Sequence, residues 1–192
     1  NLANKYRKTQ NKDFWSEGSL GECGLFGQHM FNQAGKYITV CEGELDAMSA
    51  YQLLGSKYAS VSIKNGAAGA LKNCKQSLTY LNKFENIVLC FDNDAVGRSA
   101  ATEVARLFEP NKCKVITLEH KDANEYLKLG LREKFTQAWW NAKTYTPAGI
   151  INLADLGESL YEETYSETCL YPWPKLNEKT YGMRTGELVC FT

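Results

Sequence analysis

Residues 37–46 carry the sequence YITVCEGELD, in which a short apolar and β-branched run ends abruptly in carboxylates. Residues 87–94 repeat this arrangement with the sequence IVLCFDND. Runs of this kind are typical of buried parallel strands. Because ligands of open α/β sheets bind in the crevice at the carboxyl ends of the strands, we expect both acidic clusters to lie at one shared site.

The acids of this expected site are Glu42 and Asp46 after the first run, and Asp92 and Asp94 after the second. Four converging carboxylates without basic partners would repel one another unless a cation lay between them. Hard divalent cations with oxygen ligands meet that requirement, and Mg²⁺ is the first candidate. Any one acid taken alone could instead cap a helix or lie in a solvated turn, so the prediction depends on their conjunction.

Alternating strand-like and helix-like segments predict an α/β fold with a mainly parallel sheet and helices on both faces. The expected strands cover residues 37–41, 58–63, 86–91 and 113–118. The expected helices cover residues 45–54, 69–81 and 97–108, with further helices within 122–142. Core positions are predicted from helical spacing at Ala101, Val104, Ala105 and Phe108. Trp139 and Trp140 are also expected to pack in the core rather than to stack on bases.

The acidic motifs resemble those of a known family. Glu42-Gly43-x-x-Asp46, followed by Asp92-x-Asp94-x-x-Gly97-Arg98, resembles the Toprim metal site of primases, topoisomerases and some nucleases. The later stretch at residues 121–125, KDANE, resembles the Toprim domain of bifunctional bacteriophage primase-helicases, which are related to the mitochondrial helicase twinkle. The resemblance runs from about Tyr37 to the C-terminus and is weaker before Tyr37.

The resemblance implies a site and an activity. The implied catalytic residues are Glu42, Asp46, Asp92 and Asp94, with Glu42 a candidate general base, and the implied metal ligands are Glu42, Asp92, Asp94 and Asp122. The implied cofactor is Mg²⁺ or Mn²⁺, and the implied reaction is the synthesis of short RNA primers on single-stranded DNA at a replication fork.

The same resemblance implies partners and a location. The partners are a single-stranded DNA template, ribonucleotide triphosphates, a replicative DNA polymerase and the other subunits of a homo-oligomeric ring. The location is the cytoplasm of an infected bacterial host. No membrane is expected as a partner, because no apolar stretch approaches the length of a bilayer span.

The resemblance also implies a division of the chain. Residues 1–34 would end a basic N-terminal primase subdomain, 35–145 would form the Toprim domain, 146–176 a linker, and 177–192 the start of a RecA-like helicase domain. Leu153, Leu156 and Leu160 recur at helical spacing and predict an amphipathic linker helix over about 152–163. In the family this helix docks on a neighbouring subunit, and folding back on its own Toprim core is the alternative.

The last residues are expected to lead into the helicase domain. Residues 185–192, with the sequence TGELVCFT, predict a turn that enters a buried strand, the first of the RecA-like domain. The parent protein is then expected to continue within about ten residues into a phosphate-binding loop of the type G-x-x-x-x-G-K-[ST].

Two glycine-bearing turns are candidate phosphate contacts. The loop NGAAGA at residues 65–70 lies between an expected strand and an expected helix, where free N–H groups around Gly66 could hold an anion and Lys64 could add charge. A tight turn that permits close packing is the alternative. Arg98 could contact a phosphate or temper the neighbouring acids.

Overall charge gives no sign of nucleic acid, because 22 Lys plus Arg balance 22 Asp plus Glu. A local basic run is nevertheless predicted to contact DNA, with a solvated face as the alternative. Its members are Lys5, Arg7, Lys8 and Lys12. The seven cysteines have no zinc-ligand spacing, and Cys41, Cys90 and Cys113 are expected to be buried in strands.

Two other functions stay open. A Toprim nuclease or topoisomerase-like enzyme would use the same metals, although a topoisomerase also needs a tyrosine nucleophile in another domain. A catalytically silent Toprim module would bind DNA and stabilise a helicase ring after losing acids, whereas here the acids are present.

Overall fold

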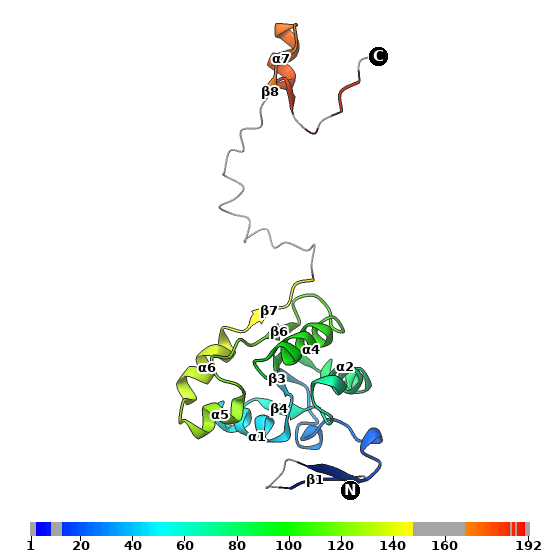
Figure 1. Ribbon diagram of the computed structural model, residues 1–192, viewed down its shortest axis with the longest axis vertical. Helices are drawn as coiled ribbons and strands as arrows, with labels where there is room; N and C mark the ends of the chain where they lie inside the picture. Colours follow the sequence, from blue (N-terminus) through cyan, green and yellow to red (C-terminus); the bar gives the residue numbers. More distant parts are fainter. Residues whose placement is uncertain (1–2, 9–12, 148–167, 185, 187, 191–192) are drawn as a thin grey trace. The chain divides into compact units, whose positions relative to one another are not determined.

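The computed structural model describes residues 3–8, 13–147, 168–184, 186 and 188–190 (Figure 1). The chain divides into two compact units, residues 1–147 and 148–192. The acidic motifs all lie in the first unit, which contains the central sheet. None of the described helices has the length and apolar composition that a membrane span requires.

The central sheet has five strands in the order β4-β3-β5-β6-β7. Four run parallel: β3 (Gly35–Cys41), β4 (Ala59–Ser62), β5 (Phe84–Cys90) and β6 (Cys113–Val115). The edge strand β7 (Lys143–Thr144), which was not predicted, is antiparallel to β6. Because Cys41 lies opposite Cys90 in the β3–β5 register, Glu42 and Phe91 leave the sheet side by side.

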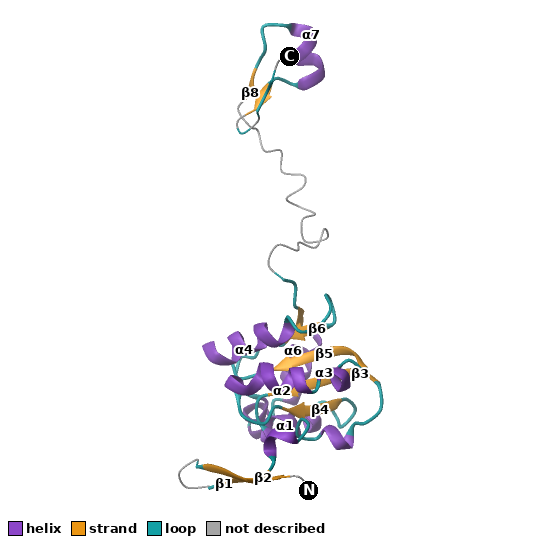
Figure 2. Ribbon diagram, turned by 90° about the vertical axis from the view of Figure 1, so that its right-hand side faces the viewer, coloured by secondary structure: helices purple, strands orange, loops and turns teal. Residues whose placement is uncertain are grey.

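Helices cover both faces of this sheet (Figure 2). One face packs against α1 (Glu44–Leu53), α5 (Ala123–Lys128) and α6 (Arg132–Trp140), and the other against α2 (Ala70–Gln76), α3 (Leu78–Leu81) and α4 (Ala95–Ala105). Alternate residues of β5 enter the two cores, Val88 on the first face and Ile87 on the second. The strands are therefore apolar on both sides, as the sequence pattern predicted.

Most predicted elements are present with shifted ends. The helix expected over 69–81 begins with a short 3₁₀ turn, η3 (Ala67–Gly69), and then divides into α2 and α3, because the backbone leaves helical geometry at Ser77 (φ −102°, ψ 17°). The helix expected over 97–108 begins earlier, at Ala95, because Asp94 caps it. The strand expected over 113–118 ends at Val115.

The core predictions are confirmed except at one tryptophan. Ala101, Val104, Ala105 and Phe108 are buried, and so are the three strand cysteines. Trp139 is 1% exposed, but Trp140 is 50% exposed, so its predicted place in the core is wrong. Neighbouring helix positions differ by about 100° in direction, so the two residues cannot both point into one core.

The N-terminal part of the first unit is a hairpin followed by irregular chain. β1 (Ala3–Arg7) pairs antiparallel with β2 (Phe14–Gly18), and two 3₁₀ turns, η1 (Leu20–Glu22) and η2 (Gln28–Met30), lead to β3. An isolated bridge joins Phe26 to Ser62 of β4 and ties this segment to the sheet.

The second unit contains β8 (Thr168–Cys169), α7 (Pro174–Thr180) and β9 (Met183–Arg184), with the two strands antiparallel. The predicted linker helix over 152–163 lies outside the described residues. The strand predicted over 185–192 is absent from its described part, Leu188–Cys190, which is exposed. A buried strand needs a partner for its backbone groups, and no described residue pairs with these three.

Candidate active site

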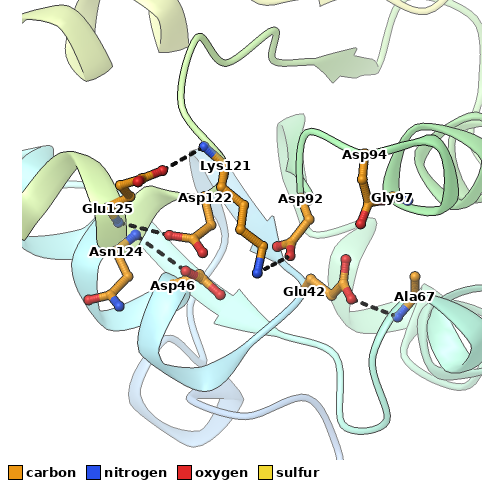
Figure 3. A network of polar contacts seen from close by, with 10 residues as sticks. All are labelled: Glu42, Asp46, Ala67, Asp92, Asp94, Gly97, Lys121, Asp122, Asn124 and Glu125. Atoms are coloured by element: carbon orange, nitrogen blue, oxygen red, sulfur yellow. Dashed lines mark hydrogen bonds and ion pairs between the residues drawn. The ribbon is translucent and has the colours of Figure 1, made fainter.

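The carboxyl ends of β3 and β5 bring the sequence-predicted acids into one region. Glu42 follows β3, Asp92 and Asp94 follow β5, Asp46 lies in the first turn of α1, and Asp122 precedes α5. Figure 3 shows Glu42, Asp46, Asp92 and Asp122 around a shared space, with Asp94 turned toward Gly97 beside it. The parallel topology produces this grouping, because every strand before an acid ends at the same edge.

The Glu42 carboxylate is held by the glycine loop. Its Oε1 accepts a hydrogen bond of 3.2 Å from the Ala67 N–H. Its Oε2 is buried and has no hydrogen-bond partner among the described residues. Burial and then the charge of Asp92 raise the pKa of Glu42, while the nearby N–H groups of Ala67 and Asp92 oppose the shift. The loop therefore binds an anion, and that anion is a carboxylate of the same chain.

Asp46 is the acid whose pKa is raised most clearly. Its Oδ1 accepts a hydrogen bond of 3.3 Å from the Asn124 N–H. Burial, followed by the charge of Asp122, raises the pKa of Asp46 to about 6. Asp46 is thus poised to exchange a proton near neutral pH.

Lys121 supplies a cation that we did not expect among the acids. Its Nζ lies 3.6 Å from Asp92 Oδ2, and Figure 3 shows its side chain extending between Asp92 and Asp122. Burial raises the pKa of Asp92, Lys121 lowers it, and Asp122 raises it again. Asp92 in turn raises the pKa of Lys121. The expectation of acids without basic partners is therefore wrong, because an ammonium group partly balances their charge.

Asp94 and Asp122 each cap a helix. Asp94 Oδ1 accepts a hydrogen bond of 2.7 Å from the Gly97 N–H at the start of α4, and Asp122 Oδ1 accepts one of 2.8 Å from the Glu125 N–H at the start of α5. Each cap commits one carboxylate oxygen and fixes the side chain's direction. Gly97 is required here because a Cβ would lie 2.3 Å from the Asp92 carbonyl oxygen.

These residues fit a divalent cation in their chemistry. All are carboxylates, and Glu42 Oε2 lacks a partner among the described residues. Burial raises the pKa values of Glu42, Asp46 and Asp92, and neighbouring carboxylates add to each shift. In the described part of the chain, however, no three His, Cys, Asp or Glu side chains are placed to hold a metal ion as they stand. A cation would therefore have to draw the carboxylates together.

Comparisons with known proteins agree on the type of domain. The model of the Toprim-like family matches residues 39–127. The DNA helicase/primase of Enterobacteria phage T3 is 35% identical over 189 residues, which are 96% of this chain and 33% of that protein. The primase fragment of the bacteriophage T7 primase-helicase matches with a TM-score of 0.66 and 37% identity, over 72% of this chain and 57% of that chain.

A second T7 structure matches over more of its own length. It contains the lagging-strand DNA polymerase interacting with primase domains of two gp4 subunits bound to an RNA/DNA hybrid and dTTP. The TM-score is 0.67 at 35% identity, over 74% of this chain and 78% of that chain. This chain belongs to the Toprim-like family of phage primase-helicases. It spans about a third of the length of the T3 relative.

Membership of the Toprim family agrees with a divalent metal at this site. Toprim primases typically use divalent metals, and this agrees with the donor set of the acidic cluster. Mg²⁺ and Mn²⁺ are not distinguished by these residues, because both accept carboxylate oxygens.

The predicted phosphate contacts differ in their placement. Lys64 is 5% exposed, and its Nζ donates to the carbonyl oxygens of Gly21 and Cys23. This placement does not support a phosphate contact, because the ammonium group is buried and already satisfied. Arg98 is exposed, and its Nη1 donates to Asn93 Oδ1 at 3.1 Å, so it lies beside the acids without pairing with one.

Two of the predicted DNA contacts, Lys5 and Lys8, lie in β1 of the N-terminal hairpin and directly after it. Lys5 Nζ is 2.6 Å from Glu44 Oε1 and 2.8 Å from the Lys64 carbonyl oxygen, so it ties the hairpin to the start of α1. Lys8 is exposed after β1, whereas the Arg7 side chain and Lys12 lie outside the described residues. The basic run therefore has one member that already has an acidic partner.

Sequence reasoning missed the roles of Lys121, Asn124 and Glu44. Lys121 and Asn124 flank Asp122 in the stretch KDANE, so the family motif contained them without indicating their contacts. Glu44 lies between Glu42 and Asp46, and its partner Lys5 is 39 residues away in the chain. Only the folded arrangement shows that contact.

Proposed function

We propose that this chain is the DNA primase part of a phage primase-helicase and that it extends short RNA primers on single-stranded DNA by nucleotidyl transfer. The observation that carries this proposal is the group of five acids at the carboxyl ends of the strands, in a chain 35% identical to the T3 DNA helicase/primase. The primase domains in the T7 structure are bound to an RNA/DNA hybrid and dTTP, which are ligands of the chemistry proposed here.

Glu42, Asp92, Asp94 and Asp122 would hold a divalent cation, Mg²⁺ or Mn²⁺. When bound, such a cation reduces the charge of the triphosphate and activates the attacking hydroxyl. Asp46 and Glu42 are the candidates to accept the proton of the primer 3′ hydroxyl, because burial raises the pKa of both carboxyl groups, that of Asp46 to about 6.

Cations at the rim of the acidic cluster would position the polyanionic ligands. Lys121, with 65% of its side chain exposed, and Arg98 would contact the phosphates of the incoming nucleotide. Lys5, Arg7, Lys8 and Lys12 are proposed contacts for the template. The ion pair between Lys5 and Glu44 supports this, because it holds the hairpin beside the acids.

The roles of the full-length protein are proposals as well. We infer a homo-oligomeric ring with a RecA-like helicase domain, contact with a replicative DNA polymerase, and a site of action in the host cytoplasm. The T3 relative is a helicase/primase of which this chain covers 33%, and the T7 primase domains interact with a DNA polymerase.

The test is extension of a short RNA annealed to single-stranded DNA, with labelled ribonucleotides and Mg²⁺ or Mn²⁺. A preformed hybrid removes any need for template recognition. We expect extension by the unmodified chain and none by Asp92→Asn/Asp94→Asn. Glu103→Gln, an exposed acid of α4, is the matched control. Equal extension by the double variant would contradict the proposal, and metal-dependent cleavage without extension would indicate a nuclease.

One observation favours a catalytically silent module instead. Lys121 already lies among the acids, and no three possible metal ligands among the described residues are close enough together to hold a metal ion. Calorimetric titration with Mg²⁺ decides between the two, because a silent module would release no heat at millimolar Mg²⁺ while still binding DNA.

A further inference from the structure

The amino ends of the parallel strands, opposite the acids, carry lysines. Lys36 lies in β3, Lys57 shortly before β4, Lys83 directly before β5 and Lys112 directly before β6. The first three are exposed, and Lys112 Nζ donates to the Asn82 carbonyl oxygen. Among the described residues around these strand starts, the acids are Glu85 and Glu109. Positive charge therefore predominates at this end of the sheet.

An aromatic cluster lies beside these lysines. It consists of Tyr37, Tyr58, Trp139 and Trp140, whose ring centroids are 4.8 to 5.8 Å apart. Trp139 is buried and donates from Nε1 to Thr39 Oγ1 at 3.0 Å, whereas Trp140 is half exposed. The other three rings meet Trp140 at interplanar angles of 80° to 88°. Trp140 is thus held in place by packing while half of its surface faces water.

Trp140 lines one hollow of the surface and contacts residues that line another. It lines the first, of about 520 Å³, together with Leu53 and Arg132; Glu133 also lines it. Its ring contacts Tyr37 and Tyr58, which line the second hollow, of about 620 Å³. Lys36 and Lys57 line the second hollow too. Both volumes fall within the range of roughly 300 to 1,000 Å³ that is common for sites of small ligands, so each has room for a nucleobase.

We propose that this surface, formed by Lys36, Tyr37, Lys57, Tyr58 and Trp140, binds single-stranded nucleic acid. A base would stack on Trp140, and Lys36 and Lys57 would contact the adjacent phosphates. Stacking on aromatic rings combined with neutralisation of phosphates is the general means of binding single strands without sequence preference. Packing of Trp140 against three rings lowers the cost of ordering it when a strand binds.

The proposed surface is distinct from the candidate active site and goes beyond the proposed function. It lies at the amino ends of the strands, whereas the acids lie at the carboxyl ends. A strand bound here would be held away from the repulsive field of the carboxylates. An acidic polypeptide would satisfy the lysines but would make no use of an exposed, fixed indole ring, so a nucleic-acid strand is the better fit.

The binding test uses the 192-residue chain, fluorescein-labelled dT15 and fluorescence anisotropy over a salt series, in EDTA. Trp140→Ala should weaken binding roughly 5- to 150-fold, the range for loss of one stacked base, and Trp140→Phe should restore part of the affinity. Lys36→Glu/Lys57→Glu should also lower the slope of log affinity against log salt by about 1.4 in magnitude, for two phosphate contacts. Lys72→Glu/Lys75→Glu on α2 changes the same charge elsewhere and should have a smaller effect.

A second readout separates stacking from a structural role. Binding of dT15 should quench tryptophan fluorescence, and Trp140→Phe should lose that part of the quenching while circular dichroism shows an unchanged fold. Unaltered affinity and quenching in the Trp140 variants would overturn the proposal. So would equal affinity for poly-L-glutamate with the same dependence on Trp140, which would indicate an acidic protein partner.

The active-site variant keeps this inference separate from the proposed primase activity. Asp92→Asn/Asp94→Asn should bind dT15 at least as tightly as the unmodified chain, because the proposed surface is at the other end of the sheet. Loss of dT15 binding in that variant would overturn the proposed surface, whatever the outcome of the primer-extension assay.

Discussion

The two ends of the parallel sheet carry opposite charges. Acids gather where β3 and β5 end, and lysines gather where the same strands begin. The crossover helices α1 and α4 run back along the sheet, so their N-termini lie at the acidic end, where the positive end of the helix dipole favours carboxylates. In this fold the common direction of the strands therefore places acidic side chains at one end of the sheet and basic side chains at the other. We propose that one end binds cations and that the other binds polyanions.

The largest expected effect tests the acidic end. Asp92→Asn/Asp94→Asn should reduce primer extension and Mg²⁺ binding at least about 100-fold, as expected when charged groups of a reaction centre are removed. Asparagine is chosen because it caps helices as well as aspartate does, so α4 should remain folded. Isothermal calorimetry and the extension assay measure the two losses. Unchanged Mg²⁺ affinity would mean that the metal binds elsewhere.

A second prediction tests how the acidic end is held together. Gly97→Ala should lower the free energy of unfolding by about 1–3 kcal/mol or more, because its Cβ would lie 2.3 Å from the Asp92 carbonyl oxygen and the backbone must shift. Gly21→Ala is the control, since a Cβ there meets nothing within 4 Å. Urea denaturation provides both values. Equal stability of the two variants would show that α4 can move away from β5 without cost.

The third prediction concerns pH at the acidic end. The pKa of Asp46 is raised to about 6 in the folded state, above the usual value of about 3.9, so the folded state binds more protons between these pH values. Stability without metal should therefore fall as the pH rises from about 4 to about 7. Asp46→Asn should be more stable than the unmodified chain at pH 7.5, by roughly 1–3 kcal/mol, and similar at pH 4.

Denaturation at the two pH values measures this difference. Glu42 and Asp92 have raised pKa values as well, so some pH dependence of the same sign should persist in Asp46→Asn. A variant that is no more stable than the unmodified chain at pH 7.5 would show that burial and the charge of Asp122 do not raise the pKa of Asp46.

The last prediction compares two neighbouring residues at the basic end, and one of them should show the smallest effect. Trp139→Phe removes the buried hydrogen bond to Thr39 and should cost about 1–3 kcal/mol, because a buried hydroxyl loses its partner. Trp140→Phe, at a half-exposed position, should change stability by less than about 0.5 kcal/mol. Thermal unfolding of both variants measures the contrast. A large loss in Trp140→Phe would mean that its ring serves packing rather than binding.

The fold was predictable wherever a short apolar run and its following acid lie together in the sequence. Residues 37–46 and 87–94 contain both the strand and the acids that follow it, so the local pattern was enough to predict the acidic end. The place of Lys121 was not predictable, because its direction depends on how α5 packs against α1. The burial of Lys64 was not predictable either, since its carbonyl partners come from irregular chain more than 40 residues earlier.

The exposure of Trp140 could not be predicted without the tertiary structure either. The sequence WW indicated two apolar residues on a helix, and only the structure shows that Trp139 is buried against Tyr37 while Trp140 stays half exposed. The strand expected near Leu188 was inferred from its apolar residues alone. Its backbone groups find no partner among the described residues, so no strand forms there, and the RecA-like domain to which it was assigned stays a prediction.

The capping contacts of Asp94 and Asp122 give the acidic cluster a mechanical property. One oxygen of each carboxylate accepts a hydrogen bond from the first turn of a helix, so the positions of Asp94 and Asp122 depend on those of α4 and α5. A displacement of α4 or α5 would therefore change the separation of these two carboxylates.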